Sequence, residues 1–113
     1  MPMAARRATR PKDSAKRHVL LLGLEVSDDA QYAEYRAGMT PILERYGGKF
    51  GYDFVVSRVL KSETPEPINR VFTLLFPDAA TADRFFSDTT YLAVRERFFE
   101  PSVSSVTSLA TFE

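Results

Sequence analysis

Three tyrosines and two arginines are the residues of this sequence best suited to bind or act on a small molecule. They are Tyr35, Tyr52, Arg58, Tyr91 and Arg95. A phenol donates a hydrogen bond to a carbonyl or stabilises an enolate-like oxygen, and a guanidinium binds a carboxylate. We predict that these side chains line a cavity between a sheet and its helices and bind a ligand there. The alternative is structural: the tyrosines are core aromatics with satisfied hydroxyls, and the arginines pair with acids such as Asp53 or Glu96.

His18 is the only histidine, and its place at the start of a predicted strand allows two interpretations. It could act as a general base or haem ligand, or it could be a half-exposed residue at the edge of a strand. We favour the second interpretation. One histidine is too few for a histidine metal site, cysteines are absent, and the carboxylates show no metal-ligand spacing. We therefore predict no metal and no cofactor, and the sequence leaves any catalytic residue unassigned.

Hydrophobic periodicity predicts an α+β fold with the element order β-α-β-β-α-β and a split second helix. We expect strands at 18–26, 50–60, 70–76 and 103–112, a first helix between 28 and 46, and two helical pieces between 78 and 100. In the second strand, alternation predicts that one face carries Phe50, Tyr52, Phe54, Val56, Arg58 and Leu60. This order of elements is the ferredoxin-like motif.

Both faces of the first predicted strand, residues 18–26, are largely apolar. A strand of this kind is covered on both sides. The helices of the same chain can cover one face, and a second copy of the chain is the simplest candidate for the other. We therefore expect a homodimer.

Charge is unevenly distributed along the chain. The 113 residues have no net charge, but residues 1–18 carry six basic side chains and one acid. We predict a disordered basic arm at 1–17 and a single domain at 18–113. No apolar run approaches the roughly 18 residues of a membrane span, so we expect a cytoplasmic protein. Nucleic-acid contact through residues 6–17 is disfavoured, because the arm has no aromatic side chain to stack on bases.

Several short motifs resemble one known family. They are Tyr32 and Tyr35 before Pro41, then Tyr46-Gly47-Gly48-Lys49-Phe50, then Phe76-Pro77, and Ala82 to Phe86-Ser87 followed by Tyr91. Together, over residues 19–113, they resemble the DUF1330 family. The resemblance implies a dimeric α+β barrel, in which two ferredoxin-like sheets pack face to face. That group includes cofactor-free monooxygenases, lactone isomerases and haem-degrading enzymes, whereas DUF1330 itself is named for its unknown function.

This sequence departs from the DUF1330 pattern at two places. Leu75 stands where the family often has an acid, and Leu60-Lys61 stands where it often has Glu-Gly. These departures lower the expectation of shared catalysis. The arginine that the family carries in its third helical piece corresponds to Arg95 or Arg97.

Three functions remain open from the sequence. The first is a pocket for a small molecule with a carbonyl or carboxylate, in which cofactor-free isomerase or oxygenase chemistry could take place. The second is a non-catalytic homodimeric binding or interaction module. The third is the contact between the basic arm and nucleic acid.

Overall fold

The computed structural model describes residues 17–113, and the fold class predicted from the sequence is confirmed. The predicted basic arm lies outside the described residues except for Arg17. The elements follow in the order β1 (His18–Val26), α2 (Asp29–Arg45), β2 (Lys49–Val55), β3 (Arg70–Phe76), α3 (Ala79–Phe86), α4 (Thr89–Val94), the π-helical turn η2 (Arg95–Phe99) and β4 (Val103–Phe112). None of the helices in this part of the chain is both long and apolar enough to cross a membrane.

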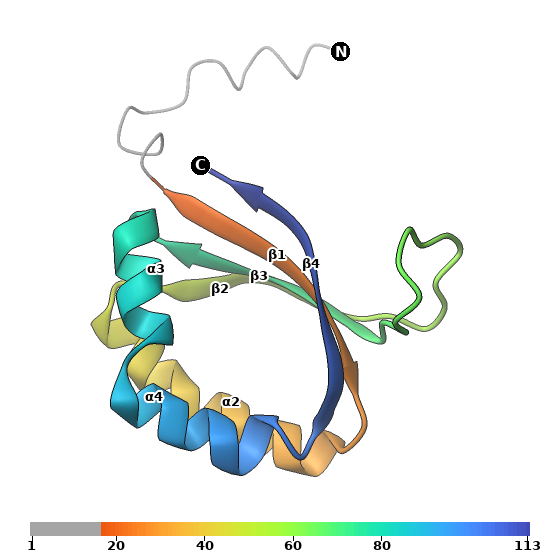
Figure 1. Cartoon of the computed structure of the whole chain (residues 1–113), viewed down its shortest axis with the longest axis horizontal. Coiled ribbons are helices and arrows are strands. Elements are labelled where there is room, and N and C mark those ends of the chain that lie inside the picture. Colours follow the sequence, from red (N-terminus) through yellow and green to blue (C-terminus); the bar gives the residue numbers. More distant parts are fainter. Residues whose placement is uncertain (1–16) are drawn as a thin grey trace.

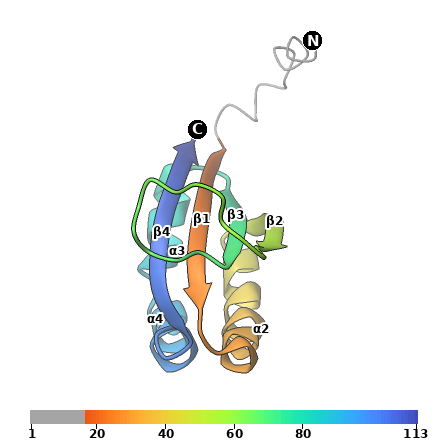
Figure 2. The same cartoon turned by 90° about the vertical axis from the view of Figure 1, so that its right-hand side faces the viewer.

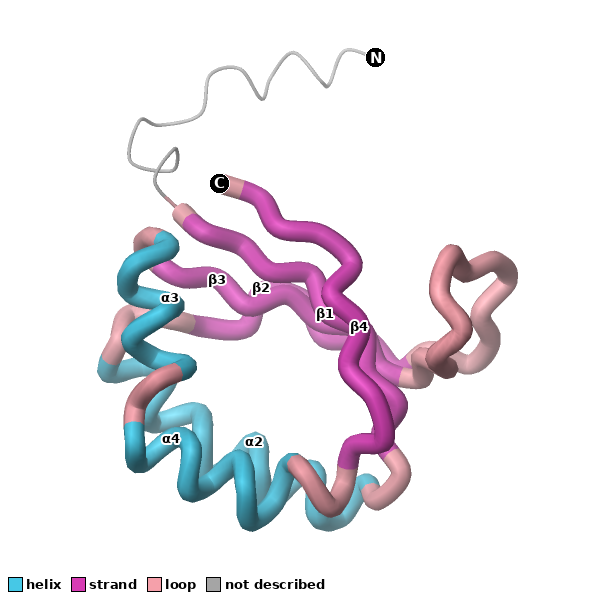
Figure 3. The backbone as a smooth tube through the Cα atoms, in the orientation of Figure 1, coloured by secondary structure: helices cyan, strands magenta, loops and turns pink. Residues whose placement is uncertain are grey.

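The four strands form one antiparallel sheet in the order β2-β3-β1-β4. The helices lie on one side of this sheet, as Figures 1 and 3 show. Leu24, Phe72, Leu74 and Phe76 point from β1 and β3 toward the helices and are buried. The core is therefore a single layer of side chains between the sheet and the helices.

Helix α2 has defined signals at both ends. The Asp28 carboxylate accepts a hydrogen bond from the Gln31 N–H at 3.0 Å and caps the first turn. At the other end, Gly47 has a φ of +74° and donates to the Glu44 carbonyl, while Gly48 donates to the Leu43 carbonyl. This is a Schellman ending, which needs a residue in the left-handed region and therefore favours glycine.

The predicted second helix is split, as expected from the sequence. Asp78 accepts from the Thr81 N–H and caps α3, and Asp88 accepts from the Thr90 and Tyr91 N–H groups and caps α4. The last turn is a π-helix, in which the Glu100 N–H donates to the Arg95 carbonyl at 3.0 Å. Such turns are rare and are frequent at functional sites.

The predicted face assignment in the second strand is wrong beyond Phe50. Phe50 pairs with Leu74 and Asp53 pairs with Phe72, so two residues of β2, Gly51 and Tyr52, oppose the single residue Thr73. This β-bulge adds one residue and moves every later side chain to the opposite face. Phe50 therefore points to the core, whereas Tyr52 and Phe54 stack on each other on the outer face.

The bulge is fixed by a side chain of the neighbouring strand. The Tyr52 N–H donates to the Thr73 hydroxyl at 2.8 Å. A Cβ atom at Gly51 would lie 2.5 Å from that same hydroxyl oxygen, so only glycine leaves room for it. Strand β2 also ends at Val55, five residues earlier than predicted, and residues 56–69 form a long loop instead.

One consequence of the bulge is a charged cluster beside α2. Asp53 accepts two hydrogen bonds from the Arg70 guanidinium, at 2.9 and 3.0 Å. It also forms an ion pair with Arg36, at 3.0 Å. The Arg36 guanidinium also lies 3.6 Å from the centre of the Phe50 ring. The cluster therefore joins β2, β3 and α2 at this edge of the sheet.

The single histidine lies at the other end of the sheet. His18 Nδ1 is 2.7 Å from a carboxylate oxygen of Glu113, so the start of β1 contacts the end of the chain. The His18 side chain is mostly buried and no cavity described below includes it. Its position agrees with a structural residue at the end of a strand.

We predict that Asp53→Asn destabilises the protein in a pH-dependent way. Partial burial favours the neutral acid, but the hydrogen bonds from Arg70 and the charge of Arg36 outweigh it and lower the pKa of Asp53. A lowered pKa stabilises the fold above the unfolded pKa of about 3.9, and this stabilisation is lost as the pH falls. The free energy of unfolding at pH 7 should fall by about 1–2 kcal/mol.

The control for this experiment is Asp83→Asn, because Asp83 is an exposed acid of α3. Chemical denaturation at several pH values measures both variants. If the cluster is responsible, the free energies of unfolding of Asp53→Asn and the wild type should converge in acid, and Asp83→Asn should match the wild type at every pH. An equal loss of stability at every pH would contradict this account.

Candidate functional site

A small cavity lies between the inner face of the sheet and the helices. Its volume is about 80 Å³. The lining residues come from β1, α2, β2, β3, α3, α4, η2 and β4, and they are Leu22, Leu24, Tyr35, Met39, Phe50, Phe72, Leu74, Phe86, Tyr91, Arg95, Phe99 and Val106. Three of the five predicted site residues, Tyr35, Tyr91 and Arg95, are brought together here.

The polar centre of this cavity is a pair of tyrosine hydroxyls. The Tyr35 and Tyr91 hydroxyl oxygens lie 2.8 Å apart, and the two residues are only 5% and 3% exposed. Two hydroxyls carry two protons, and one proton suffices for the bond between them. Within the described part of the chain, neither hydroxyl makes another hydrogen bond to protein. The pair therefore offers one unused O–H donor next to the cavity.

Both phenols are neutral at physiological pH. Burial raises the pKa of the Tyr35 phenol far above its usual value of about 10, and the neighbouring Tyr91 adds to this shift. Burial also raises the pKa of Tyr91, although the hydrogen bond between Tyr91 and Tyr35 and the charge of Arg95 oppose the shift. A neutral phenol is a hydrogen-bond donor, so the pair suits an oxygen acceptor on a ligand.

Arg95 supplies the positive charge of the cavity. Its side chain is 39% exposed, so it lies at the solvent end, whereas the two tyrosines lie inside. The guanidinium carbon is 4.9 Å from the centre of the Phe99 ring, and the π-helical turn presents both side chains to the same cavity. Its ion pair with Glu100 is long, at 4.0 Å. The guanidinium therefore has donors available for an anion.

The start of α4 determines where Tyr91 lies. The Asp88 carboxylate accepts from the Tyr91 N–H at 2.9 Å and from the Tyr46 hydroxyl at 2.7 Å. Tyr46 follows α2, so this bond joins the end of α2 to the start of α4. The hydrogen bond from Tyr46 also lowers the pKa of Asp88, which keeps the cap ionised. Close packing of Gly38 against Val94 lets the two helices approach each other.

The other two predicted site residues lie elsewhere. Tyr52 is 66% exposed on the outer face of the sheet, because the β-bulge turns it away from the helices. Arg58 is exposed in the long loop, because β2 ends before it. Arg97, the alternative to Arg95 for the family's arginine, is exposed beside Phe98 and does not line the cavity.

Sequence reasoning missed the aromatic wall of this cavity. Phe50, Phe72, Phe86 and Phe99 all contribute to it. Two patterns in the sequence could have signalled these rings: Phe99 stands in the helical piece that carries Tyr91, and alternation puts Phe72 and Leu74 on one face of a strand. The sequence does not show how the strands pair and how the helices pack on them, and it is this packing that brings the four rings into one cavity.

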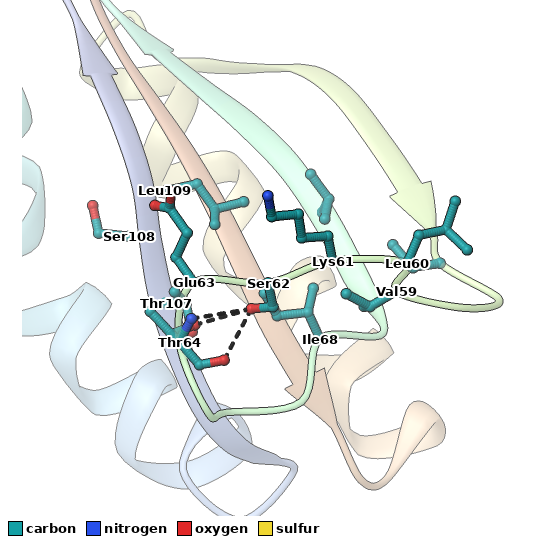
Figure 4. A pocket seen from close by; sticks show the side chains of 12 residues that line it. Val59, Leu60, Lys61, Ser62, Glu63, Thr64, Ile68, Thr107, Ser108 and Leu109 are labelled. Atoms are coloured by element: carbon teal, nitrogen blue, oxygen red, sulfur yellow. Dashed lines mark hydrogen bonds between the residues drawn. The ribbon is translucent and has the colours of Figure 1, made fainter.

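A second and larger hollow lies on the opposite face of the sheet, under the loop of residues 56–69 (Figure 4). Figure 2 shows this loop crossing in front of the strands. Its volume is about 630 Å³. Apolar side chains such as Leu60 and Ile68 line it together with Lys61, Glu63 and several hydroxyl groups. The hydroxyls of Ser62 and Thr64 contact each other and the loop backbone. Thr107 is a buried polar residue of this groove, but the groove is open and its other polar side chains are exposed. We place the candidate site in the inner cavity, where two buried hydroxyls meet.

No group of three or more metal-ligating side chains occurs among residues 17–113. Phenols, one guanidinium and aromatic rings are not a usual ligand set for a metal ion. The chemistry open to the inner cavity is therefore hydrogen bonding and charge stabilisation by protein groups.

We predict that the two tyrosines of the cavity, like the buried Tyr32, resist ionisation in the folded protein. Burial raises their pKa values, so the stabilisation is complete below pH 10 and is lost as the pH rises further. Tyrosinate absorbance should show a late phase that appears only when the protein unfolds. Tyr91→Phe should reduce this phase, whereas Tyr52→Phe should leave it unchanged. A single early phase for all tyrosines in the native protein would contradict the burial of the pair.

Comparisons with known proteins agree with this fold and leave the chemistry open. The family described as "Domain of unknown function (DUF1330)" matches residues 19–106. A protein of unknown function from Rhodopseudomonas palustris is similar in structure, with a TM-score of 0.73, 18% identity and coverage of 97% of this chain and 88% of that chain. A dabb family protein with a ferredoxin-like fold from Mesorhizobium loti has a TM-score of 0.61 at 14% identity and covers 86% and 95%. No curated protein matches. The chain belongs to the DUF1330 family.

Proposed function

We propose that this protein binds a small organic molecule bearing a carbonyl or carboxylate in the cavity between the sheet and the helices. The observation that carries the proposal is the buried Tyr35–Tyr91 hydroxyl pair with its unused donor. A buried polar hydrogen without a partner is unfavourable, so such a donor is normally satisfied by water or by a ligand. Arg95, at the mouth of the same cavity, supplies a complementary charge for an anionic group.

Binding without proton transfer is the form of this function that the lining supports best. Among the described residues that line the cavity, none is Asp, Glu or His. Tyr35 and Tyr91 hold their protons too tightly to act as bases at pH 7. The phenols and Arg95 could still stabilise an enolate-like oxygen on a ligand that ionises readily by itself. The proposal requires no cofactor.

We predict that a fragment library of small carbonyl and carboxylate compounds contains binders for this cavity. Protein-observed NMR on the full chain should show shifts at Tyr35, Tyr91 and Arg95. Tyr91→Phe should weaken binding by roughly tenfold, because one buried hydrogen bond is worth about 1 kcal/mol or more. Tyr52→Phe is the matched control and should bind as the wild type does. If fragments shift only the NMR signals of residues in the outer groove, the binding site lies in that groove and the proposal is wrong.

A second copy of the chain is the proposed partner. The outer face of the sheet carries apolar side chains that the helices do not cover, among them Tyr52 at 66% and Phe54 at 54% exposure. Val71 and Leu75 of β3 are also on this face and only partly buried. Exposed apolar groups gathered on one face favour association. The resemblance to dimeric α+β barrels points to the same face.

We predict that the purified protein is a dimer and that Phe54→Glu converts it to a monomer. A charge at this position would be buried without a partner in a sheet-to-sheet interface. Light scattering at micromolar concentration measures the mass of each variant. Leu92→Glu is the control, because Leu92 is an exposed apolar residue of the helical layer. A wild-type monomer would rule out the proposed dimer, while the ligand proposal would stand.

A further inference from the structure

We infer that the cavity is built for a short 2-oxo carboxylic acid, whose acyl end enters the cavity while its carboxylate stays on Arg95 at the mouth. This inference rests on the proposed function and deepens it by naming the ligand class. It follows from the size of the cavity, from the different exposure of its two kinds of polar group, and from the apolar side chains that share its lining.

The volume limits what can be fully enclosed. A cavity of about 150 Å³ holds benzene, which has six heavy atoms. At about 80 Å³, this cavity encloses roughly half as much, the size of an acetyl group. The rest of a larger ligand must therefore lie at the mouth. A long or ring-bearing substituent on the ligand would not fit inside the cavity.

The two kinds of polar group lie at different depths. The tyrosine hydroxyls are almost fully buried, whereas the Arg95 side chain reaches solvent. All three side chains line the same cavity, so one ligand can contact both the hydroxyl pair and the guanidinium. A ligand that satisfies both needs an uncharged acceptor inside and an anion at the mouth. Because the cavity encloses little more than an acetyl group, the anion must follow directly after the carbon that bears the acceptor. A 2-oxo acid has this arrangement: a methyl and a keto oxygen inside, and a carboxylate outside.

The interior suits the uncharged end of such a molecule. The cavity that holds the hydroxyl pair is also lined by buried apolar side chains, namely Leu24, Met39, Phe72 and Leu74. A methyl or methylene group gains free energy by leaving water there, whereas a second charge would be desolvated without a partner. Dicarboxylates that place a charge at each end are therefore excluded from this binding mode.

Glu100 is an internal competitor for the same guanidinium. Its carboxylate lies 4.0 Å from Arg95 Nε, and 60% of its side chain is exposed, so it can move away without breaking packing. A ligand carboxylate replaces this long contact with a shorter one. Removing the charge of Glu100 should therefore tighten binding of an anionic ligand, and Glu96 on the same turn, also exposed, provides the matched control.

The experiment titrates the full-length protein with pyruvate and with three relatives, using NMR shifts of the Tyr and Arg signals. Propionate has the carboxylate without the keto oxygen, acetone has the ketone without the carboxylate, and phenylpyruvate adds a ring. Pyruvate should bind about tenfold more tightly than propionate or acetone, because each relative loses one polar contact. Phenylpyruvate should bind more weakly than pyruvate.

Variants assign the contacts. Arg95→Gln should weaken pyruvate binding about tenfold and leave acetone unchanged, whereas Arg97→Gln should change neither. Glu100→Gln should tighten pyruvate binding by about two- to fivefold, and Glu96→Gln should have no such effect. Glu96, Arg97 and Glu100 are exposed and the Arg95 side chain is partly exposed, so we expect all four variants to fold.

Equal affinities for pyruvate and propionate, or for pyruvate and phenylpyruvate, would overturn the inference. If other fragments shift Tyr35 and Tyr91 while pyruvate does not, the ligand class is wrong and the binding function stands. If no compound of either panel shifts these signals, the proposed function fails as well.

Discussion

The hydrogen bond between the Tyr35 and Tyr91 hydroxyls is a buried polar contact inside the largely apolar layer between the helices and the sheet. It joins α2 to α4 at 2.8 Å, and aromatic rings surround it on several sides, with Phe99 4.8 Å from Tyr35 and Phe85 4.3 Å from Tyr91 between ring centres. In such surroundings a polar group must be satisfied or it costs stability. The packing of this layer must therefore hold the two phenols within hydrogen-bond distance. It must also leave an acceptor, such as water or a ligand, within reach of the second hydroxyl proton.

Several features of the fold serve this geometry. Asp88 caps α4 and bonds Tyr46, so the helix that carries Tyr91 is fixed to the end of the helix that carries Tyr35. Gly38 permits the close approach of α2 to α4, and the π-helical turn brings Arg95 and Phe99 to the mouth of the cavity. The two faces of the sheet then have separate tasks in our proposals: the inner face holds the ligand, and the outer face, with Tyr52 and Phe54, meets a second copy.

Much of this arrangement was accessible from the sequence. Strand alternation and helical spacing predicted the ferredoxin-like order and the split second helix, and residue type singled out Tyr35, Tyr91 and Arg95. The position of Tyr52 was not accessible, because one extra residue at the Gly51 bulge reverses the face of everything after it, and alternation cannot show an insertion. The position of Arg58 depended on where β2 ends, which is set by pairing with β3. The cavity itself arises from long-range packing among eight elements, and its volume has no local signal.

A double-mutant cycle on the hydroxyl pair is the most direct test of the central claim. The free energies of unfolding of the wild type, Tyr35→Phe, Tyr91→Phe and the double variant isolate the coupling between the two hydroxyls from the effect of each ring. Our account predicts a favourable coupling of about 1 kcal/mol, the value of a buried hydrogen bond. A coupling of zero, with the two losses simply additive, would mean that the phenols do not act as one polar unit, and the proposed site would lose its centre.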